Sequence, residues 1–314
     1  MKLTKLILSI FSATAFCSCS AVYETDNICQ QGADVRLTFR KNMQGEDLFS
    51  SEVHCSKILL YDGEGRFYDD ITLPEDGRLN IDLPLGAYHA IAYGGMSCEN
   101  ADIEFSANPK TGDHYSDIMT QLKDTRATQM AKNIHSHFHG TADFAVTMED
   151  MDYVPVNIDL TKNNNRFRVN LQYSDGSEID ADDFNFTIAA DNAVAAHDNS
   201  IIPQGTDVVY APYEKGESDG TAWAEISLPR LMANGEARLK VTRTNADEPV
   251  VDLEILQYLS SIKEKEMQGA SFQEYLDKCD SWTLVFILDP ESDKFAGLSF
   301  TINNWEVRLN IFDL

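Results

Sequence analysis

Short runs of alternating apolar and polar residues recur along most of the chain, and this alternation limits its fold more than any other feature. Val35–Arg40 (VRLTFR) and Val154–Leu160 (VPVNIDL) show the pattern clearly. Neighbouring side chains of a β-strand point to opposite faces of the sheet, so each run is predicted to be a half-buried strand. Glycine, proline and asparagine separate the runs, as they do in all-β domains.

Two sets of strands are predicted. The first set comprises Val35–Arg40, Lys57–Tyr61, Phe67–Leu73, Asn80–Leu83, Tyr88–Tyr93, Asp143–Val146 and Val154–Leu160. The second set comprises Arg166–Tyr173, Phe184–Ala189, Val208–Tyr210, Ala222–Pro229, Ala237–Arg243, Trp282–Leu288, Leu298–Ile302 and Trp305–Ile311. Asn108–Asn133 is expected to be a long connection with some helix. Leu253, Leu256, Leu259 and Ile262 recur about one helical turn apart, which predicts a helix.

The polar stretch Thr161–Asn165 (TKNNN) separates the two sets. Its side chains are not expected to enter a core, so it is the best candidate for a domain boundary. The sequence therefore predicts two tandem all-β sandwiches of about 130 and 150 residues, covering residues 32–162 and 163–314, with short helical insertions.

Residues 1–18 have the features of a secretory signal peptide. Lys2 and Lys5 accompany the apolar run Leu6–Phe11, and small residues follow it. This run is too short to cross a membrane, which takes about 20 apolar residues.

A small residue before a cysteine marks the lipoprotein form of such a signal. Cys19 follows Ser18, whereas Cys17 follows the bulky Phe16, so we expect a lipid on Cys19, with Cys17 as the alternative. Residues 19–31 are then a lipidated tether, and the mature chain is anchored by lipid without spanning the membrane. The competing interpretation is a soluble secreted protein whose two neighbouring cysteines are coincidental.

The charge of the chain argues against one class of partner. Without residues 1–18 the chain has 23 Lys+Arg against 51 Asp+Glu, a net charge of −28. Such a surface repels nucleic acid and anionic lipid, so no nucleic-acid partner is expected.

Four further cysteines are available for disulfides: Cys29, Cys55, Cys98 and Cys279. An oxidising compartment permits bridges, and four cysteines allow three complete pairings. Because Cys29, Cys55 and Cys98 lie in the first half, at most one bridge is expected among them, and its pairing stays open. No CxxC pair or ligand cluster occurs, so neither structural zinc nor any other cofactor is predicted.

The turn Leu83–Tyr88 (LPLGAY) fits a tight connection between two strands, since Pro84 fixes φ at the bend and Gly86 tolerates positive φ. Turns of the form LPxGxY are common in transthyretin-like seven-stranded sandwiches.

Longer motifs then follow one another in a characteristic order. They are CQQGADVRLTFRKNMQGEDLF at Cys29–Phe49, KILLYDGEGRF at Lys57–Phe67, DFNFTIAADN at Asp183–Asn192, VVYAPY at Val208–Tyr213, QEYLDKCDSWTLVFIL at Gln273–Leu288 and INNWEVRLN at Ile302–Asn310. Behind a lipoprotein signal, this order resembles the FimB/Mfa-type fimbrial anchor family (minor fimbrial subunits) of Bacteroidetes, over essentially the whole mature chain. Many relatives have Cys-Pro where this chain has Cys29–Gln30, which changes a turn and leaves the implied role unchanged.

The resemblance implies two tandem transthyretin-like, Greek-key β-sandwich domains, lipidated at the N-terminal cysteine and displayed on the outer membrane. Family members sit at the base of a fimbrium, hold its shaft to the cell and help to end its growth. The implied partners are therefore fimbrial shaft and accessory pilin subunits, paired by β-strand addition. The sequence does not separate a base anchor from a tip subunit.

The stretch Asn133–Gly140 (NIHSHFHG) contains three histidines at alternate positions. On one strand, His135, His137 and His139 would share a face and could offer three nitrogen ligands to zinc. Same-face residues of a strand lie roughly 7 Å apart, whereas zinc needs ligands converging at about 2 Å, so no metal site is predicted and these three are only secondary candidates. The resemblance implies that Phe138 points into the core and that the histidines line the outward face.

The sequence does not point to an enzyme, since it contains none of the catalytic motifs GxSxG, HExxH and the P-loop. Trp282 and Trp305 could stack on sugars, but both lie in alternating strands and are expected in a core. The alternative to a fimbrial role is a surface glycan-binding lipoprotein of β-sandwich fold.

Overall fold

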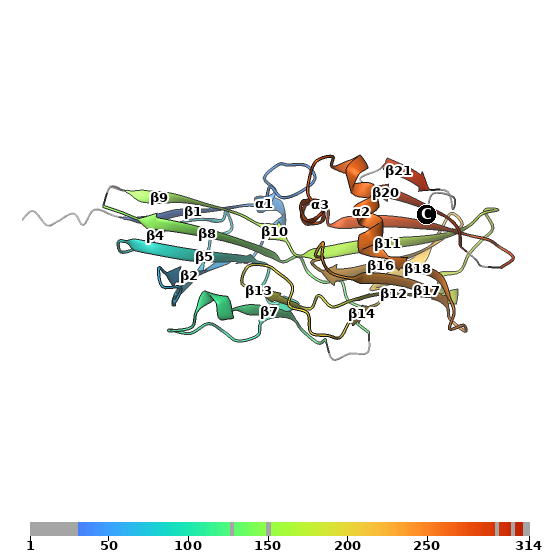
Figure 1. Cartoon of the computed structure of the whole chain (residues 1–314), viewed down its shortest axis with the longest axis horizontal. Coiled ribbons are helices and arrows are strands. Elements are labelled where there is room, and N and C mark those ends of the chain that lie inside the picture. The colour runs from blue at the N-terminus through green and yellow to red at the C-terminus, as the bar shows by residue number, and fades with distance from the viewer. Residues whose placement is uncertain (1–30, 126–128, 149–151, 293–294, 303–304, 310–314) are drawn as a thin grey trace, which may run out of the picture.

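Two β-sandwiches lie end to end along the long axis of the molecule (Figure 1). The computed structural model describes residues 31–125, 129–148, 152–292, 295–302 and 305–309. It confirms the predicted all-β class of tandem sandwiches with short helical insertions.

The first sandwich consists of two facing sheets in the described part of the chain. One sheet has the strand order β4-β1-β9, and the other has the order β10-β8-β5-β2-β3. Their strands are β1 (Gly32–Thr38), β2 (Lys57–Asp62), β3 (Phe67–Thr72), β4 (Arg78–Asp82), β5 (Gly86–Gly94), β8 (Phe138–Val146), β9 (Tyr153–Asp159) and β10 (Thr161–Lys162). The short helix α1 (Phe49–Glu52) connects β1 to β2.

Alternating side chains of these strands fill the space between the two sheets. Val35 and Leu37 of β1 meet Ile58 and Leu60 of β2 in one cluster of buried residues. Each of the four is at most 1% exposed. Burial at every second position is what the alternation in the sequence requires.

The outer face of the five-stranded sheet is buried as well. Leu59, Tyr61, Ile91 and Tyr93 point away from the sandwich core and form a second cluster with Ile118. Ile118 belongs to a long segment that includes β6 (Ile103–Phe105), the 3₁₀ turn η1 (Tyr115–Asp117) and β7 (Met119–Leu122). Both faces of this sheet are therefore covered, which explains why β2 is a nearly continuous apolar run.

The second sandwich also has two facing sheets among the described residues. Their strand orders are β15-β16-β11-β19-β20-β21 and β14-β12-β17-β18. The strands are β11 (Asn164–Tyr173), β12 (Phe184–Ala190), β14 (Val208–Tyr210), β15 (Glu214–Ser218), β16 (Thr221–Pro229), β17 (Ala237–Arg243), β18 (Pro249–Glu254), β19 (Ser281–Leu288), β20 (Phe295–Ile302) and β21 (Trp305–Leu309). The 3₁₀ turn η2 (Ala181–Asp183) precedes β12.

Two helices lie next to each other beside the second sandwich. The predicted helix is α2 (Ile255–Glu266), and α3 (Phe272–Lys278) follows it. Ser271 begins α3 with a capping box, because its side chain accepts from the Glu274 amide while Glu274 accepts from the Ser271 amide. Trp282 is 1% exposed, as expected of a core residue, and its ring stacks 6.1 Å from that of Phe167. Nothing is described for the side chain of Trp305.

The stretch Thr161–Asn165 differs from the prediction that its side chains stay out of a core. Thr161, Asn163, Asn164 and Asn165 are only 3–6% exposed. Partners from distant segments contact the side chains of Thr161, Asn163 and Asn165, whereas the buried Oδ1 of Asn164 has no hydrogen-bond partner. Asn165 donates to the Pro229 carbonyl and accepts from the Trp282 indole N–H. The stretch is thus strand and strand junction, and the division of the chain at residues 162 and 163 stays a prediction.

Candidate functional site

Cys19, the predicted lipidation site, lies outside the described residues, as do its alternative Cys17 and Cys29. The structure does place Gly32, the first residue of β1, opposite Asp82 and Tyr153 at the outer end of the first sandwich. We call this end the tether pole; it comprises the start of β1, the end of β4, the β4–β5 turn, the end of β8 and the start of β9. It points away from the second sandwich (Figure 1).

Cys55 and Cys98 form a disulfide that closes a sequence separation of 43 residues. The bridge ties the segment before β2 to the segment after β5. Cys279 is a free cysteine, and its side chain is buried. Burial raises the pKa of the Cys279 thiol to about 12, which makes the thiol a poor nucleophile at neutral pH.

The three candidate histidines do not share a strand face. β8 begins at Phe138, so only His139 lies on the strand, while His135 and His137 precede it. Phe138 is 1% exposed and packs against Phe39, which agrees with its expected inward position. The expected outward row is wrong, because His137 and His139 are only 8% and 5% exposed.

His139 faces away from the sandwich core, but chain from the second half covers that face. Its Nε2 donates to the carbonyl oxygen of His197 at 2.8 Å, and its ring lies 5.3 Å from that of Tyr93. Burial lowers the pKa of His139 to about 4, so the imidazole is neutral at physiological pH. Burial likewise lowers the pKa of His137 to about 4.

His135 is held by a buried carboxylate. Its Nδ1 lies 2.7 Å from Asp102 Oδ2, and its backbone N–H donates to the same oxygen at 2.8 Å. Lys132 forms an ion pair with the other carboxylate oxygen. Burial works to raise the pKa of Asp102, but the hydrogen bonds from His135 and Lys132 outweigh it, and the pKa lies below its ordinary value.

Both ring nitrogens of His135 have a polar partner, because Asn100 Nδ2 lies 2.8 Å from His135 Nε2. Each of the three histidines therefore has a hydrogen-bond partner within the fold. Within the described ranges, no group of three or more His, Cys, Asp or Glu side chains is arranged to hold a metal ion.

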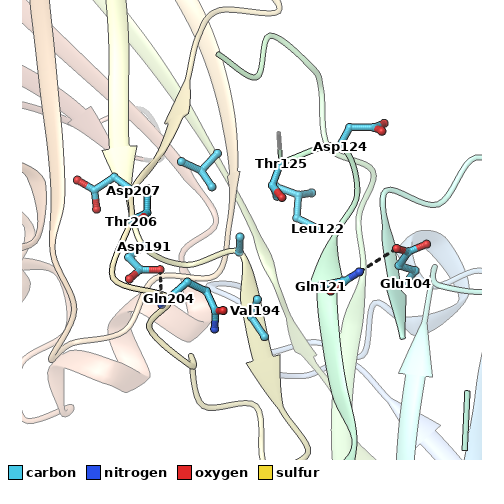
Figure 2. Close-up of a pocket in the computed structure, with 12 residues that line it drawn as sticks. Glu104, Gln121, Leu122, Asp124, Thr125, Asp191, Val194, Gln204, Thr206 and Asp207 are labelled. Carbon is cyan, nitrogen blue, oxygen red and sulfur yellow. Dashed lines mark hydrogen bonds between the residues drawn. The ribbon is translucent and has the colours of Figure 1, made fainter. Parts of the chain in front are cut away.

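A hollow of about 880 Å³ lies between β6–β7 and the chain that precedes β14 (Figure 2). Its described lining includes Glu104, Asp124, Asp191 and Asp207, and it includes no aromatic or basic side chain. The Gln121 side chain donates to Glu104 at 3.0 Å, and the backbone N–H of Gln204 donates to the Asp191 carboxylate at 2.9 Å (Figure 2). The described lining is therefore mainly acidic and polar.

The junction between the sandwiches contains a bridging lysine. Lys162 Nζ lies 2.8 Å from Glu52 of α1 and 2.6 Å from Asp280, which precedes β19. Burial works to lower the pKa of Lys162, but the two carboxylates outweigh it and raise the pKa above its ordinary value. The Lys162 side chain is only 13% exposed, so this pair of contacts is partly shielded from water.

A loop from the second half also reaches across the junction. We call residues 191–202 the junction loop; it contains β13 (Val194–Ala196), which pairs with β7. Asn199 of this loop exchanges side-chain hydrogen bonds with Asn163, and its carbonyl accepts from Arg230. Arg230 in turn forms a bidentate pair with Asp277. The junction loop therefore binds the first half to the body of the second.

Several outermost strands offer backbone groups to another chain. In the described sheets these are β3, β4, β9, β15, β18 and β21, each five or more residues long. Natural sheets guard such edges with charge and proline. Here Asp69 and Asp70 lie on β3, Lys215 on β15, Pro155 on β9 and Pro249 at the start of β18.

No pattern in the sequence pointed to the residues that join the two halves. Asn199 lies 36 positions from its partner Asn163, Arg230 lies 47 positions from its partner Asp277, and neither belongs to a recognisable motif. The structure describes no helix that is long and apolar enough to cross a bilayer.

Comparisons with known proteins agree with one another. The sequence profile of the family described as fimbrillin-A associated anchor proteins Mfa1 and Mfa2 matches residues 25–311. No protein with a curated description matches the sequence.

Three solved structures illustrate the structural similarity. A protein of Bacteroides thetaiotaomicron described as a candidate adhesin is 28% identical, with a TM-score of 0.78, over 89% of this chain and 98% of that chain. A candidate polysaccharide-binding protein of the same species has 20% identity and a TM-score of 0.79, over 90% and 99% of the two chains. The fimbrial anchor protein Mfa2 of Porphyromonas gingivalis has 15% identity and a TM-score of 0.68, over 88% and 99%. At these identities the last two similarities concern the fold alone.

Proposed function

The chain belongs to the family of fimbrillin-A associated anchor proteins, and from this premise we propose that it holds a fimbrium to the outer membrane, or ends its growth, by pairing with a shaft subunit. The family match over residues 25–311 carries the proposal, since it covers both sandwiches. Membership places the chain at the cell surface in association with fimbriae.

The proposed attachment to the membrane is a lipid on Cys19, with Cys17 as the alternative. The signal-like residues 1–18 support it. A single acyl chain gives only marginal membrane binding, so the two or three chains of a lipoprotein cysteine suit a protein that resists pull on a filament.

The proposed contact with the shaft is β-strand addition at one of the open sheet edges. Backbone hydrogen bonds then supply affinity, and alternate side chains in pockets supply specificity. The strands β3, β15 and β18 are long enough for such pairing. We propose that the protein is not an enzyme. The ring nitrogens of His135 have polar partners and the thiol of Cys279 is buried, in keeping with this proposal.

Deletion of the gene tests the role. We expect fimbriae that are shed, shortened or absent, and we expect the intact gene to restore them. The Cys19→Ala chain should be released from membranes and should lose radiolabelled palmitate. Label that persists on this variant would move the anchor to Cys17.

A comparison of proline and alanine at the same edge position tests the contact. Asp70→Pro on β3, Lys215→Pro on β15 and Asp252→Pro on β18 each remove a backbone donor, whereas the matching alanine variants keep it. We expect one proline to abolish recovery of shaft subunits in pull-downs while its alanine partner has little effect. Only variants with an unchanged melting temperature are compared.

Binding through an edge should also persist at high salt, because hydrogen bonds and apolar pockets carry it. Fimbriae that stay attached in every proline variant would overturn strand addition. A purified protein that retains a polysaccharide and no pilin would overturn the fimbrial role.

A further inference from the structure

Three of the four large apolar side chains that are exposed in the described part of the chain lie at or beside the tether pole. The four are Tyr68, Leu85, Met119 and Met148, at 47%, 42%, 39% and 84% exposure. Single exposed apolar residues are ordinary on a soluble protein, but a group of them marks a contact surface. Leu85 and Met148 belong to the tether pole, Tyr68 lies next to it near the start of β3, and Met119 lies elsewhere, on β7.

Strand register places Leu85 and Met148 at the same end of the sheet. Gly86 at the start of β5 pairs with Val146 at the end of β8. Leu85 directly precedes Gly86, and Met148 comes two residues after Val146, so both side chains are at the tips of adjacent strands.

Tyr68 extends this surface along the open end of the sandwich core. It lies at an irregularity in the β2–β3 pairing, and its ring packs 5.8 Å from that of Tyr88. Tyr88 stacks on Phe144 at 5.5 Å and donates to the Pro84 carbonyl. The pole therefore ends in apolar side chains that lie over the end of a core.

The same pole is where the chain enters from its N-terminal segment. The 13 residues from Cys19 to Gln31 precede β1. Fully extended, they span at most about 45 Å, and a flexible chain of this length spans roughly 20 Å on average. A lipid on Cys19 would therefore keep this pole, and not the second sandwich, close to the bilayer.

We propose that the tether pole rests on the surface of the lipid bilayer, with Leu85 and Met148 in the interfacial region. This inference rests on the proposed lipid anchor. A short tether gives the pole an effective concentration near the membrane in the mM range, so two or three apolar side chains suffice for a populated contact.

The charges near the pole select the kind of lipid surface. Asp62 and Asp82 lie at the ends of β2 and β4, and Glu64, after β2, is paired with Arg66 at 3.0 Å, so the charge at this end is negative on balance. Carboxylates repel anionic headgroups over about 10 Å at moderate salt. The contact is therefore assigned to neutral or zwitterionic headgroups.

Oxidative footprinting tests the contact. The lipidated full-length gene product is placed on phosphatidylcholine vesicles, and its methionine and tyrosine oxidation by hydroxyl radical is compared with that of the Cys19→Ala chain in solution. Flotation with the vesicles reports the anchor separately from the pole contact. We expect several-fold slower oxidation of Met148 and Tyr68 on vesicles. Met119, an exposed methionine on β7 opposite Ala196, is the internal control and should keep its rate.

A pair of variants adds a second readout. Leu85→Asn combined with Met148→Gln should float as well as the unchanged protein but lose the protection of Tyr68. Met119→Gln, the matched control, should leave that protection intact. Phosphatidylglycerol vesicles should give weaker protection at low salt.

The outcomes separate the two proposals. A chain that does not float overturns the lipid anchor and, with it, this inference. A chain that floats while Met148 keeps its solution rate overturns the pole contact alone. Protection that grows with protein concentration in the absence of vesicles assigns the pole to a second copy of the chain and also overturns the contact with lipid.

Discussion

Asn163 and Asn199 exchange two side-chain hydrogen bonds at the junction of the two sandwiches, at 2.6 Å and 3.0 Å. Both residues are buried, at 6% exposure each, and each amide satisfies the other. The pair connects the start of the second sandwich to the junction loop.

Removing one partner of this pair should destabilise the protein. In Asn163→Ala the buried amide of Asn199 is left without its partner, which costs about 1–3 kcal/mol of unfolding free energy. Urea unfolding followed by fluorescence measures the loss. Asn245→Ala, at an exposed loop position, is the control and should stay within about 0.5 kcal/mol of the unchanged protein. An Asn163→Ala protein as stable as this control would show that the Asn163–Asn199 pair does not stabilise the fold.

Lys162 should hold the relative orientation of the two sandwiches. Lys162→Gln leaves Glu52 and Asp280 without their shared cation, and the cost should exceed the 0–1 kcal/mol typical of exposed pairs. Small-angle scattering should show a broader range of shapes. Lys215→Gln breaks the more exposed pair with Asp182 and should leave both stability and scattering nearly unchanged.

Buried neutral histidines predict a loss of stability in mild acid. Burial lowers the pKa of His137 and His139 from 6.5 to about 4, so between these values the unfolded chain binds more protons than the folded one. Stability is therefore full above pH 6.5 and falls as the pH drops toward 4, by up to roughly 3 kcal/mol for each histidine.

Melting temperatures measured between pH 6.5 and pH 5 report mainly on the histidines, because most carboxylates titrate below this interval. We expect His139→Gln to have a shallower pH dependence than the unchanged protein over this interval. His54→Gln changes an exposed histidine and should keep the original slope. Equal slopes in all three proteins would show that the buried imidazoles do not determine the acid response.

The Cys55–Cys98 disulfide should contribute strongly to stability. For a closed loop of its length, the chain-entropy argument gives about 4 kcal/mol. The double variant Cys55→Ser with Cys98→Ser should melt well below the unchanged protein. Reducing agent should lower the melting temperature of the unchanged protein and leave the double variant unaffected. If reduction shifts both proteins equally, the bridge is not the cause.

Cys279 should be inert in the folded protein. Its thiol is buried and its pKa is raised to about 12, so thiolate is scarce at neutral pH. Peptide mapping after maleimide treatment should find Cys279 unlabelled in the native state and labelled in urea. Rapid native labelling would mean that α3 opens readily.

The strand pattern of the sequence was sufficient for most of the fold. Burial at alternate positions identifies Val35 and Leu37 as core residues without any knowledge of their partners. The helix α2 follows in the same way from Leu256, Leu259 and Ile262 at helical spacing, whereas Leu253, the fourth residue of that pattern, lies on β18.

The pattern could not predict which polar residues are buried, because their burial depends on partners far away in the sequence. Asn163 looks like a linker residue until Asn199 is placed beside it, and His139 looks exposed until His197 covers it. Local sequence describes polarity, whereas burial of a polar group depends on a hydrogen-bond partner that only the tertiary structure supplies.

The position of β1 has a mechanical consequence. Its hydrogen-bonded neighbours are β4 on one side and β9 on the other, and its first residue, Gly32, is at the tether pole. A pull on the N-terminus along the strand therefore loads both ladders in shear, and their hydrogen bonds must break together instead of one after another. Resistance to force depends on the rate of unfolding, so this chain can bear tension at its N-terminus for far longer than a peeled edge strand would.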